Sequence, residues 1–189
     1  MPFDHFDLIA GFYDRAGQFR VSEPLLGLMA LSPNCLLLDA GGGTGRTATA
    51  LRSMVREVFV ADPSRGMLRR AVGKGLATVC TPAESLPFPS GSFDRIILMD
   101  VLHHVLDQRQ SVCELWRVLA PGGRIVIIEP DIRKFIVRLL AIGEKMLLMH
   151  SHFLASGEIC SLFFDPDVKI GVNYYEINVI FVVEKVKRL

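Results

Sequence analysis

The feature that constrains this chain most is a short apolar run that ends in an acid and a cluster of glycines. Residues 36–38 are leucines, Asp39 follows them, and glycines recur at positions 41, 43 and 45. An apolar run without alternation predicts a strand that is buried on both faces, as in a parallel sheet. Glycine tolerates positive φ and lets a ligand approach the backbone, and a helix expected from residue 46 would present N–H groups beside it. The run therefore predicts a nucleotide-type site at the end of a first strand.

The spacing of these glycines narrows the choice of ligand. A dinucleotide fingerprint, Gly-x-Gly-x-x-Gly, counted from Gly41, requires glycine or alanine where this chain has Arg46. A P-loop requires the triplet Gly-Lys-Ser/Thr, which the sequence lacks. The P-loop is therefore excluded, and an NAD-dependent oxidoreductase stays an alternative that Arg46 opposes.

Predicted strands and helices alternate after the glycines. Apolar or β-branched runs predict strands at residues 57–62, 76–80, 95–99, 124–129, 168–175 and 178–186. Helical spacing and capping signals predict helices at residues 3–31 (with a second start at Pro24), 46–56, from 63, 111–119 and 131–152 (one helix or two), and one capped by Ser156. The alternation predicts a Rossmann-like, doubly wound α/β fold with a mostly parallel sheet.

Composition excludes several classes of protein. The 189 residues are 50% hydrophobic and 22% charged, which is typical of one globular domain. A formal net charge of +1 argues against an extended nucleic-acid surface. The four cysteines lack paired spacing, so we expect reduced thiols and no metal site. The N-terminus lacks a signal-peptide pattern, and no stretch has the roughly 20 apolar residues of a membrane span, so we expect a cytoplasmic protein.

Three longer phrases resemble one enzyme family. They are Thr81–Asp94 (T-P-A-E-S-L-P-F-P-S-G-S-F-D), Leu102–Asp107 (L-H-H-V-L-D) and Glu114–Pro130 (E-L-W-R-V-L-A-P-G-G-R-I-V-I-I-E-P). Together with the glycine run, they resemble the class I S-adenosylmethionine (SAM) dependent methyltransferases, in the group of the ubiquinone and menaquinone C-methyltransferases (the methyltransferase type 11 domain). The resemblance extends over residues 6–130.

The resemblance implies an activity and a domain plan. It implies an enzyme that moves a methyl group from S-adenosyl-L-methionine directly to a small-molecule acceptor and leaves S-adenosyl-L-homocysteine. It also implies an antiparallel C-terminal strand. The expected single domain (1–189) consists of N-terminal helices (1–33), a cofactor-binding core (34–130), a helical lid (131–165) and terminal strands (166–189).

The resemblance also assigns residues to the cofactor. Asp62, at the end of the second strand, can accept both ribose hydroxyls, or it can cap a helix that starts at Pro63. Pro82 stands where relatives often carry Asp or Asn for the adenine amino group, so the Ala83 N–H or Glu84 would have to serve instead. The predicted cofactor-binding residues are Tyr13, Asp39, Gly41, Gly43, Gly45, Asp62, Pro63, Met67, Ala83, Glu84 and Asp100.

The sequence leaves the catalytic group open. Only an acceptor that must lose a proton needs a general base, and the candidates are His104, His150 and His152. His103 and His104 are adjacent at an expected helix start, so their side chains should point apart. The sequence does not tell which of the two faces the site. A metal pair is not expected unless this segment is extended, because the i, i+2 spacing of His150 and His152 does not place both on one helix face.

Two other functions stay open: a regulatory protein that binds SAM without transferring its methyl group, and the NAD-dependent oxidoreductase. Turnover of SAM to S-adenosylhomocysteine distinguishes the enzyme from the regulatory protein. The sequence defines neither the acceptor nor the oligomeric state.

Overall fold

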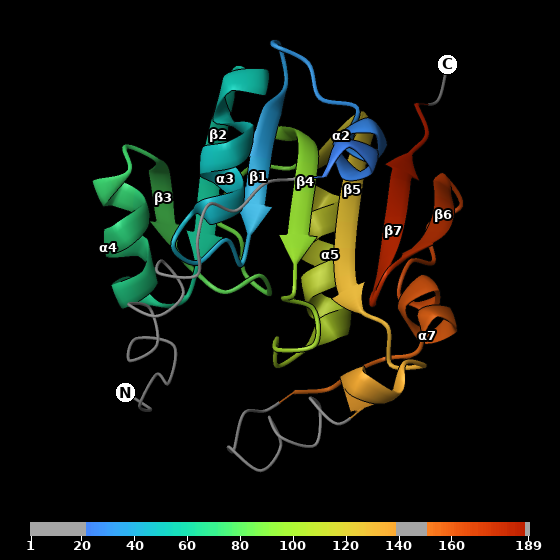
Figure 1. Ribbon diagram of the computed structural model, residues 1–189. Helices are drawn as coiled ribbons and strands as arrows, with labels where there is room; N and C mark the ends of the chain where they lie inside the picture. Colours follow the sequence, from blue (N-terminus) through green and yellow to red (C-terminus); the bar gives the residue numbers. More distant parts are fainter. Residues whose placement is uncertain (1–21, 139–150, 188–189) are drawn as a thin grey trace.

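A seven-stranded mixed sheet forms the centre of the structure (Figure 1). This computed structural model describes residues 22–138 and 151–187. The strands are β1 (Leu36–Ala40), β2 (Glu57–Asp62), β3 (Ala77–Cys80), β4 (Phe93–Met99), β5 (Leu119–Pro130), β6 (Val168–Tyr175) and β7 (Asn178–Lys185). Their order is β3-β2-β1-β4-β5-β7-β6, with β1 to β5 parallel and β7 antiparallel to both neighbours. The predicted Rossmann-like α/β fold with an antiparallel C-terminal strand is confirmed.

The strand order reverses next to β1. From β1 the chain moves outward through β2 and β3, and it then returns to the other side of β1 with β4. In an open parallel sheet, such a reversal leaves a crevice outside the carboxyl ends of the two central strands, where ligands bind. The carboxyl ends of β1, β2, β4 and β5 point to the same edge, the lower one in Figure 1. The residues that follow these strands therefore lie close together.

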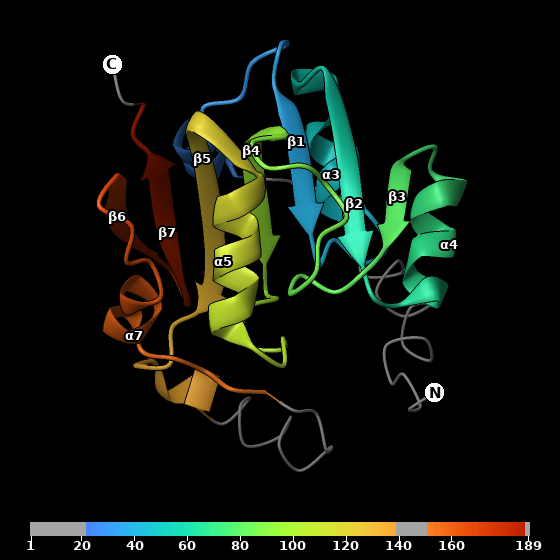
Figure 2. The ribbon, with the colours of Figure 1, turned by 180° about the vertical axis from the view of Figure 1, so that it is seen from behind.

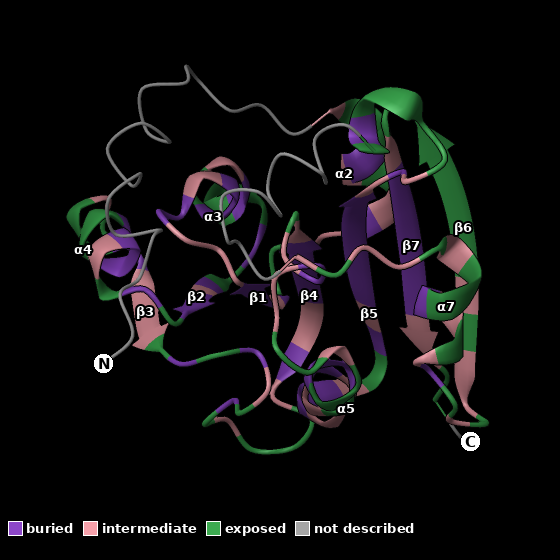
Figure 3. Cartoon of the chain, turned by 90° about the horizontal axis from the view of Figure 1, so that it is seen from below, coloured by how far each residue is buried: buried purple, intermediate pink, exposed green. Residues whose placement is uncertain are grey.

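Helices cover both faces of the sheet (Figures 1 and 2). On one face pack α2 (Glu23–Met29), α3 (Arg46–Leu51) and α4 (Arg65–Gly73), and on the other pack α5 (Gln108–Val118) and α7 (Ser156–Ser161). Figure 3 shows the buried central strands between these layers. Leu37 and Leu38 of β1 are both fully buried but belong to opposite cores, because successive strand side chains alternate between faces. None of the helices in the described part of the chain has the length and apolar character needed to cross a bilayer.

Several helix boundaries differ from the prediction. α2 ends at Met29 rather than at residue 31, and α4 begins at Arg65 rather than at residue 63. α3 ends at Leu51, and a 3-10 turn (Arg52–Met54) follows it in place of the helix predicted up to residue 56. α5 begins at Gln108 rather than at residue 111, because Asp107 accepts a hydrogen bond from the Gln110 N–H (2.9 Å) and caps the helix there. The described connection between β3 and β4, residues 81–92, contains no helix.

The described part of the expected lid is less helical than predicted. Residues 135–138 are helical, 139–150 lie outside the described residues, and 151–155 have no regular secondary structure. The predicted cap at Ser156 is wrong, because Ala155 is the N-cap of α7. Glu158 stabilises this helix start by accepting a hydrogen bond from the Ala155 N–H (2.7 Å). The helix predicted before residue 22 also lies outside the described residues.

Gly45, at the start of α3, provides a test of the packing between α3 and α4. Its φ is +73°, and a Cβ there would overlap Leu76 and lie 3.2 Å from the Cβ of Ala71. We expect Gly45→Ala to lower the free energy of unfolding by about 2–4 kcal/mol through left-handed strain and overpacking. Denaturation with urea measures this loss.

Gly73→Ala is the matched control for this substitution. No atom lies within 4 Å of a Cβ at Gly73, the last residue of α4. This variant should be as stable as the wild type or more stable by up to about 1 kcal/mol. Equal losses in the two variants would contradict the packing role of Gly45.

Candidate functional site

A cavity of about 560 Å³ lies where the strand order predicts a ligand. Its walls are residues 41–44 after β1, 62–64 after β2, 82–84 after β3 and 99–101 around the end of β4. The remaining lining residues are Asp39, Arg46, Thr47, Met67, His104, Val105 and Leu106. Its volume is within the range of small-molecule sites in proteins.

The glycine loop closes one side of the cavity. The N–H groups of Gly41 (2.7 Å) and Gly42 (3.3 Å) donate to the Ala61 carbonyl, and the Gly43 N–H donates to Asp62 Oδ2 (2.9 Å). A Cβ on Gly42 would lie 2.6 Å from Cγ of Asp39, so no side chain fits there. A Cβ on Gly43 would lie 3.9 Å from both Asp62 Oδ2 and the Met67 sulfur. Glycine at position 43 therefore leaves room between these two side chains.

Asp39 places a buried carboxyl group at the end of β1. It is 1% exposed, and its Oδ2 accepts a hydrogen bond from the Ala48 N–H of α3 (3.1 Å). Its pKa is raised from 3.8 to about 7, chiefly because burial penalises the charged form. The hydrogen bond from Ala48 lowers this pKa and the charge of Asp62 raises it, both by less than burial does. A cationic ligand group beside Asp39 would favour the carboxylate.

Asp62 organises the end of β2. Its Oδ2 accepts from Gly43, and its Oδ1 accepts from the Ser64 N–H (2.8 Å). The N-cap of α4 is Ser64, whose hydroxyl accepts from the Met67 N–H (3.2 Å), so the capping alternative for Asp62 is wrong. Asp62 holds the glycine loop against the start of this helix, with its carboxylate at the cavity wall.

Glu84 connects two walls of the cavity. Its Oε1 accepts hydrogen bonds from the N–H groups of Leu106 (2.8 Å) and Asp107 (3.3 Å). Its neighbours Pro82 and Ala83 also line the cavity. The carboxylate therefore fixes the loop before α5 as well as contributing to the wall.

The residues after β4 form a tight turn instead of the expected helix start. Asp100 has a left-handed φ of +56°, and its N–H donates to the Ile128 carbonyl (2.9 Å). The His104 N–H donates to the Val101 carbonyl (2.8 Å). The ring centroids of His103 and His104 are 4.0 Å apart, so the expectation that the two side chains point apart is wrong. The helical spacing rule does not apply in a turn.

Glu129 and residues 151–153 hold this turn from two sides. The Glu129 carboxylate accepts from the N–H groups of Val101 and Leu102 and lies 2.5 Å from His103 Nδ1. The His152 N–H donates to the His103 carbonyl (2.7 Å), and the Ser151 hydroxyl lies 3.2 Å from His104 Nδ1. The segment that follows the undescribed part of the chain therefore contacts the cavity wall.

The structure brings most of the predicted site residues together. Those that line the cavity are Asp39, Gly41, Gly43, Asp62, Pro63, Met67, Ala83, Glu84, Asp100 and His104. Gly45 instead faces α4, and His152 is exposed and contacts the turn through its backbone. Tyr13 and His150 lie outside the described residues.

Sequence reasoning missed two groups of lining residues. Thr44, Arg46, Thr47 and Ser64 follow the ends of β1 and β2, and position alone could have identified them. The apolar residues Met99, Val101, Val105 and Leu106 carry no chemical signal in the sequence. They give the cavity a partly apolar wall.

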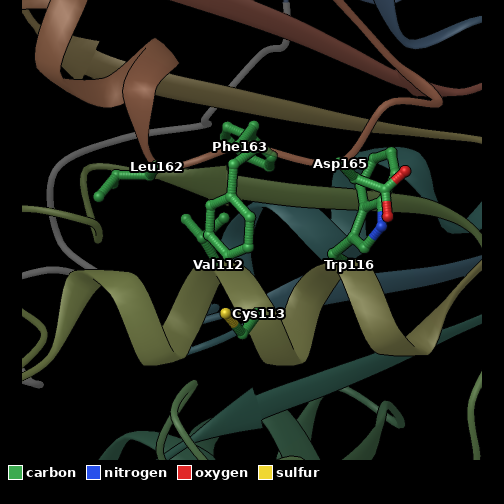
Figure 4. Close-up of a pocket in the computed structure, with 7 residues that line it drawn as sticks. Val112, Cys113, Trp116, Leu162, Phe163 and Asp165 are labelled. Atoms are coloured by element: carbon green, nitrogen blue, oxygen red, sulfur yellow. The ribbon is translucent and has the colours of Figure 1, made fainter.

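A second, smaller pocket shares no lining residue with this cavity. It has a volume of about 130 Å³ and lies between α5 and the segment after α7 (Figure 4). The rings of Trp116 and Phe163 on its wall are 6.4 Å apart, edge to face. It contains none of the predicted site residues. Within the described residues, no group of three or more side chains could hold a metal ion.

The raised pKa of Asp39 predicts a pH dependence of stability. The native state keeps a proton on Asp39 up to about pH 7, whereas the unfolded chain releases it near 3.8, so stability is lost as the pH rises through this window. In the wild type, we expect the free energy of unfolding to fall by on the order of 3–4 kcal/mol across this window. The Asn side chain of Asp39→Asn cannot titrate, so this variant should not show that fall. Denaturation of the ligand-free protein between about pH 4 and pH 8 measures this.

Glu57→Gln is the control for Asp39→Asn. It removes an exposed carboxylate at the start of β2 and should keep the pH dependence of the wild type. Identical profiles of stability against pH for Asp39→Asn and the wild type would show that Asp39 does not cause the loss of stability.

Comparisons with known proteins identify similar chains. Residues 38–127 match the family described as "Methyltransferase domain". The ubiquinone/menaquinone biosynthesis C-methyltransferase UbiE of Bordetella parapertussis is 34% identical over 140 residues, which cover 66% of this chain and 54% of the relative. The demethylmenaquinone methyltransferase of Clavibacter sepedonicus is 42% identical over 98 residues, which cover 49% and 40%. The chain thus spans about half the length of these relatives.

Solved structures show the same fold. A SAM-dependent methyltransferase of Thermotoga maritima superposes with a TM-score of 0.74 at 20% identity, covering 95% of this chain and 98% of that chain. The name of this Thermotoga protein gives SAM as its cofactor. Residues 38–127 therefore match the methyltransferase domain family, and this part of the chain is similar to the class I SAM-dependent methyltransferases of the group that contains the ubiquinone/menaquinone C-methyltransferases.

Proposed function

We propose that the protein transfers a methyl group from SAM to a small, partly apolar acceptor, and that one cavity holds both molecules. The observation that carries this proposal is the pair of buried carboxylates, Asp39 and Asp62, on either side of a glycine loop. Two acids at adjacent strand ends suit a ligand with an ammonium group and a ribose. They do not suit a pyrophosphate, which they would repel.

The residues around the cavity fit this cofactor. Among the described residues, the oxygens of Asp62 accept from the N–H groups of Gly43 and Ser64, and a carboxylate at this place can accept from the two hydroxyls of a ribose. Asp39 would pair with the ammonium group, and the space beside Gly43 would take the sugar. Pro63, Met67 and Ala83 would contact the adenine. Asp100, and Tyr13 outside the described residues, complete the proposed set.

The bound cofactor would supply a methyl group that its sulfonium already activates. The task of the chain is then to hold the acceptor in line with this group and to exclude water. Such positioning lowers a barrier by about 7–11 kcal/mol. The wall of Met99, Val101, Val105 and Leu106 would contact the acceptor through apolar surface. A hydroquinone or a similar ring suits this wall, and the names of the sequence relatives refer to quinone biosynthesis.

We assign proton acceptance to His104 for an acceptor that must lose a proton. His104 is the described candidate that lines the cavity, whereas His152 is exposed. His150 remains a candidate outside the described residues. A general base of this kind contributes about 10²–10⁴-fold to the rate.

Titration calorimetry tests the cofactor. We expect SAM and S-adenosylhomocysteine to bind and NAD not to bind. Asp62→Asn should weaken SAM binding by about 10- to 100-fold, because a hydrogen bond to a charged group contributes about 1.5–3 kcal/mol. Glu57→Gln, at the other end of β2, should bind SAM like the wild type. Tight NAD binding without SAM binding would contradict the proposal.

Formation of S-adenosylhomocysteine tests turnover. The protein is incubated with SAM and a panel of small hydroquinones, phenols and amines. With an accepted hydroxyl or carbon acceptor, His104→Gln should lower turnover by about 10²–10⁴-fold and leave SAM affinity unchanged. SAM binding without turnover on any acceptor of the panel would favour the regulatory alternative.

A further inference from the structure

Glu129, at the carboxyl end of β5, is buried (3% exposed) and surrounded by donors. Its Oε1 accepts from the N–H groups of Val101 (3.1 Å) and Leu102 (2.8 Å), and its Oε2 lies 2.5 Å from Nδ1 of His103. Two of these partners are backbone N–H groups, to which Glu129 is the acceptor, and such donors favour the charged form of a carboxylate. The third partner is a ring nitrogen, which donates when it carries a proton.

His103 is the side chain that can balance this charge. Its ring is buried (3% exposed), and the Phe153 ring stacks on it with centroids 4.3 Å apart. A buried carboxylate is costly unless a cation pairs with it. The short contact between Nδ1 and Oε2 is typical of a charge-assisted hydrogen bond. The surroundings therefore favour the protonated ring.

We infer that His103 carries both ring protons at neutral pH, paired with Glu129, and that its charge keeps the adjacent ring of His104 neutral. The two ring centroids are 4.0 Å apart, and like charges at this distance repel. A neutral imidazole can accept a proton, whereas an imidazolium cannot. His103 and Glu129 are thus positioning residues that maintain His104 as a base. This catalytic consequence rests on the proposed function, but the protonation pattern does not.

The contacts around the two rings fix their relative positions. Ser151 contacts His104 Nδ1, and the His152 N–H bonds to the His103 carbonyl. Gln108 Nε2 donates to the carbonyls of Leu102 (2.9 Å) and His152 (2.7 Å). The turn is therefore held between β5, α5 and residues 151–153, and the close approach of the rings is part of this framework.

Other charges also act on His104. The titratable or charged side chains on the surrounding described elements are Asp100, His103, Asp107, Glu129 and His152, with Asp39, Arg46, Asp62 and Glu84 elsewhere on the cavity wall. The acids favour a protonated His104 and so oppose the effect of His103. Apart from His103 and Glu129, these groups are the same in the wild type and in variants of the pair, so comparison of the two isolates the effect of this pair on His104.

Imidazole ¹⁵N NMR titration of the full chain tests this inference. The chain has five histidines, and His104→Gln and His103→Phe identify the two signals by their loss. At pH 7, His103 should show two protonated nitrogens and His104 one. In Glu129→Gln, His103 should become neutral, and the titration midpoint of His104 should rise by about one pH unit or more. General disruption would not move the two histidines in opposite directions.

His103→Phe provides an independent measurement. It keeps a ring against Phe153 but removes the charge, and the His104 midpoint should again rise. A neutral His103 in the wild type at pH 7, or an unchanged His104 midpoint in the variants, would overturn the inference. Failure of SAM binding would overturn the proposed function instead, and it would leave the NMR result intact.

Discussion

The close approach of Gly42 to the Asp39 carboxylate is the constraint on which the cavity depends. Only a residue without Cβ lets the loop fold back over the end of β1, because Cγ of Asp39 occupies that space. The same carboxylate bonds to the Ala48 N–H of α3. Strand, loop and helix thus close around one buried acid. In this conformation the N–H groups of the loop point toward the end of β2, where Asp62 accepts a hydrogen bond from one of them.

The fold and the strand-end acids could be predicted because their signals are local. The buried leucines of β1 lie on opposite faces of the sheet, and an uninterrupted apolar run indicates burial on both faces. Asp39, Asp62 and Asp100 follow three such runs, and parallel strands bring their carboxyl ends to one edge. Neither inference requires knowledge of contacts between distant parts of the chain.

The hydrogen bonds and packing that hold the site residues in place could not be predicted, because they join residues that are far apart in the sequence. Glu129 reads in the sequence as the end of a strand, and its bonds to residues 101–103 arise only when β5 pairs with β4. Gly45 has the same sequence signature as its neighbours in the loop, yet it packs against α4. The paired rings of His103 and His104 follow from a turn that helical spacing does not describe.

The hydrogen bonds of Glu84 have a consequence for how substitutions near the cavity could change the choice of acceptor. One carboxylate oxygen holds the backbone of Leu106 and Asp107. Leu106 is 89% exposed at the cavity wall, so its side chain can vary at little cost to the core. Its main chain, however, is bonded to the segment proposed to contact adenine. Substitutions here that reshape the backbone would alter the proposed cofactor and acceptor sites together. Those confined to the side chain would change the proposed acceptor site and leave the proposed cofactor site intact.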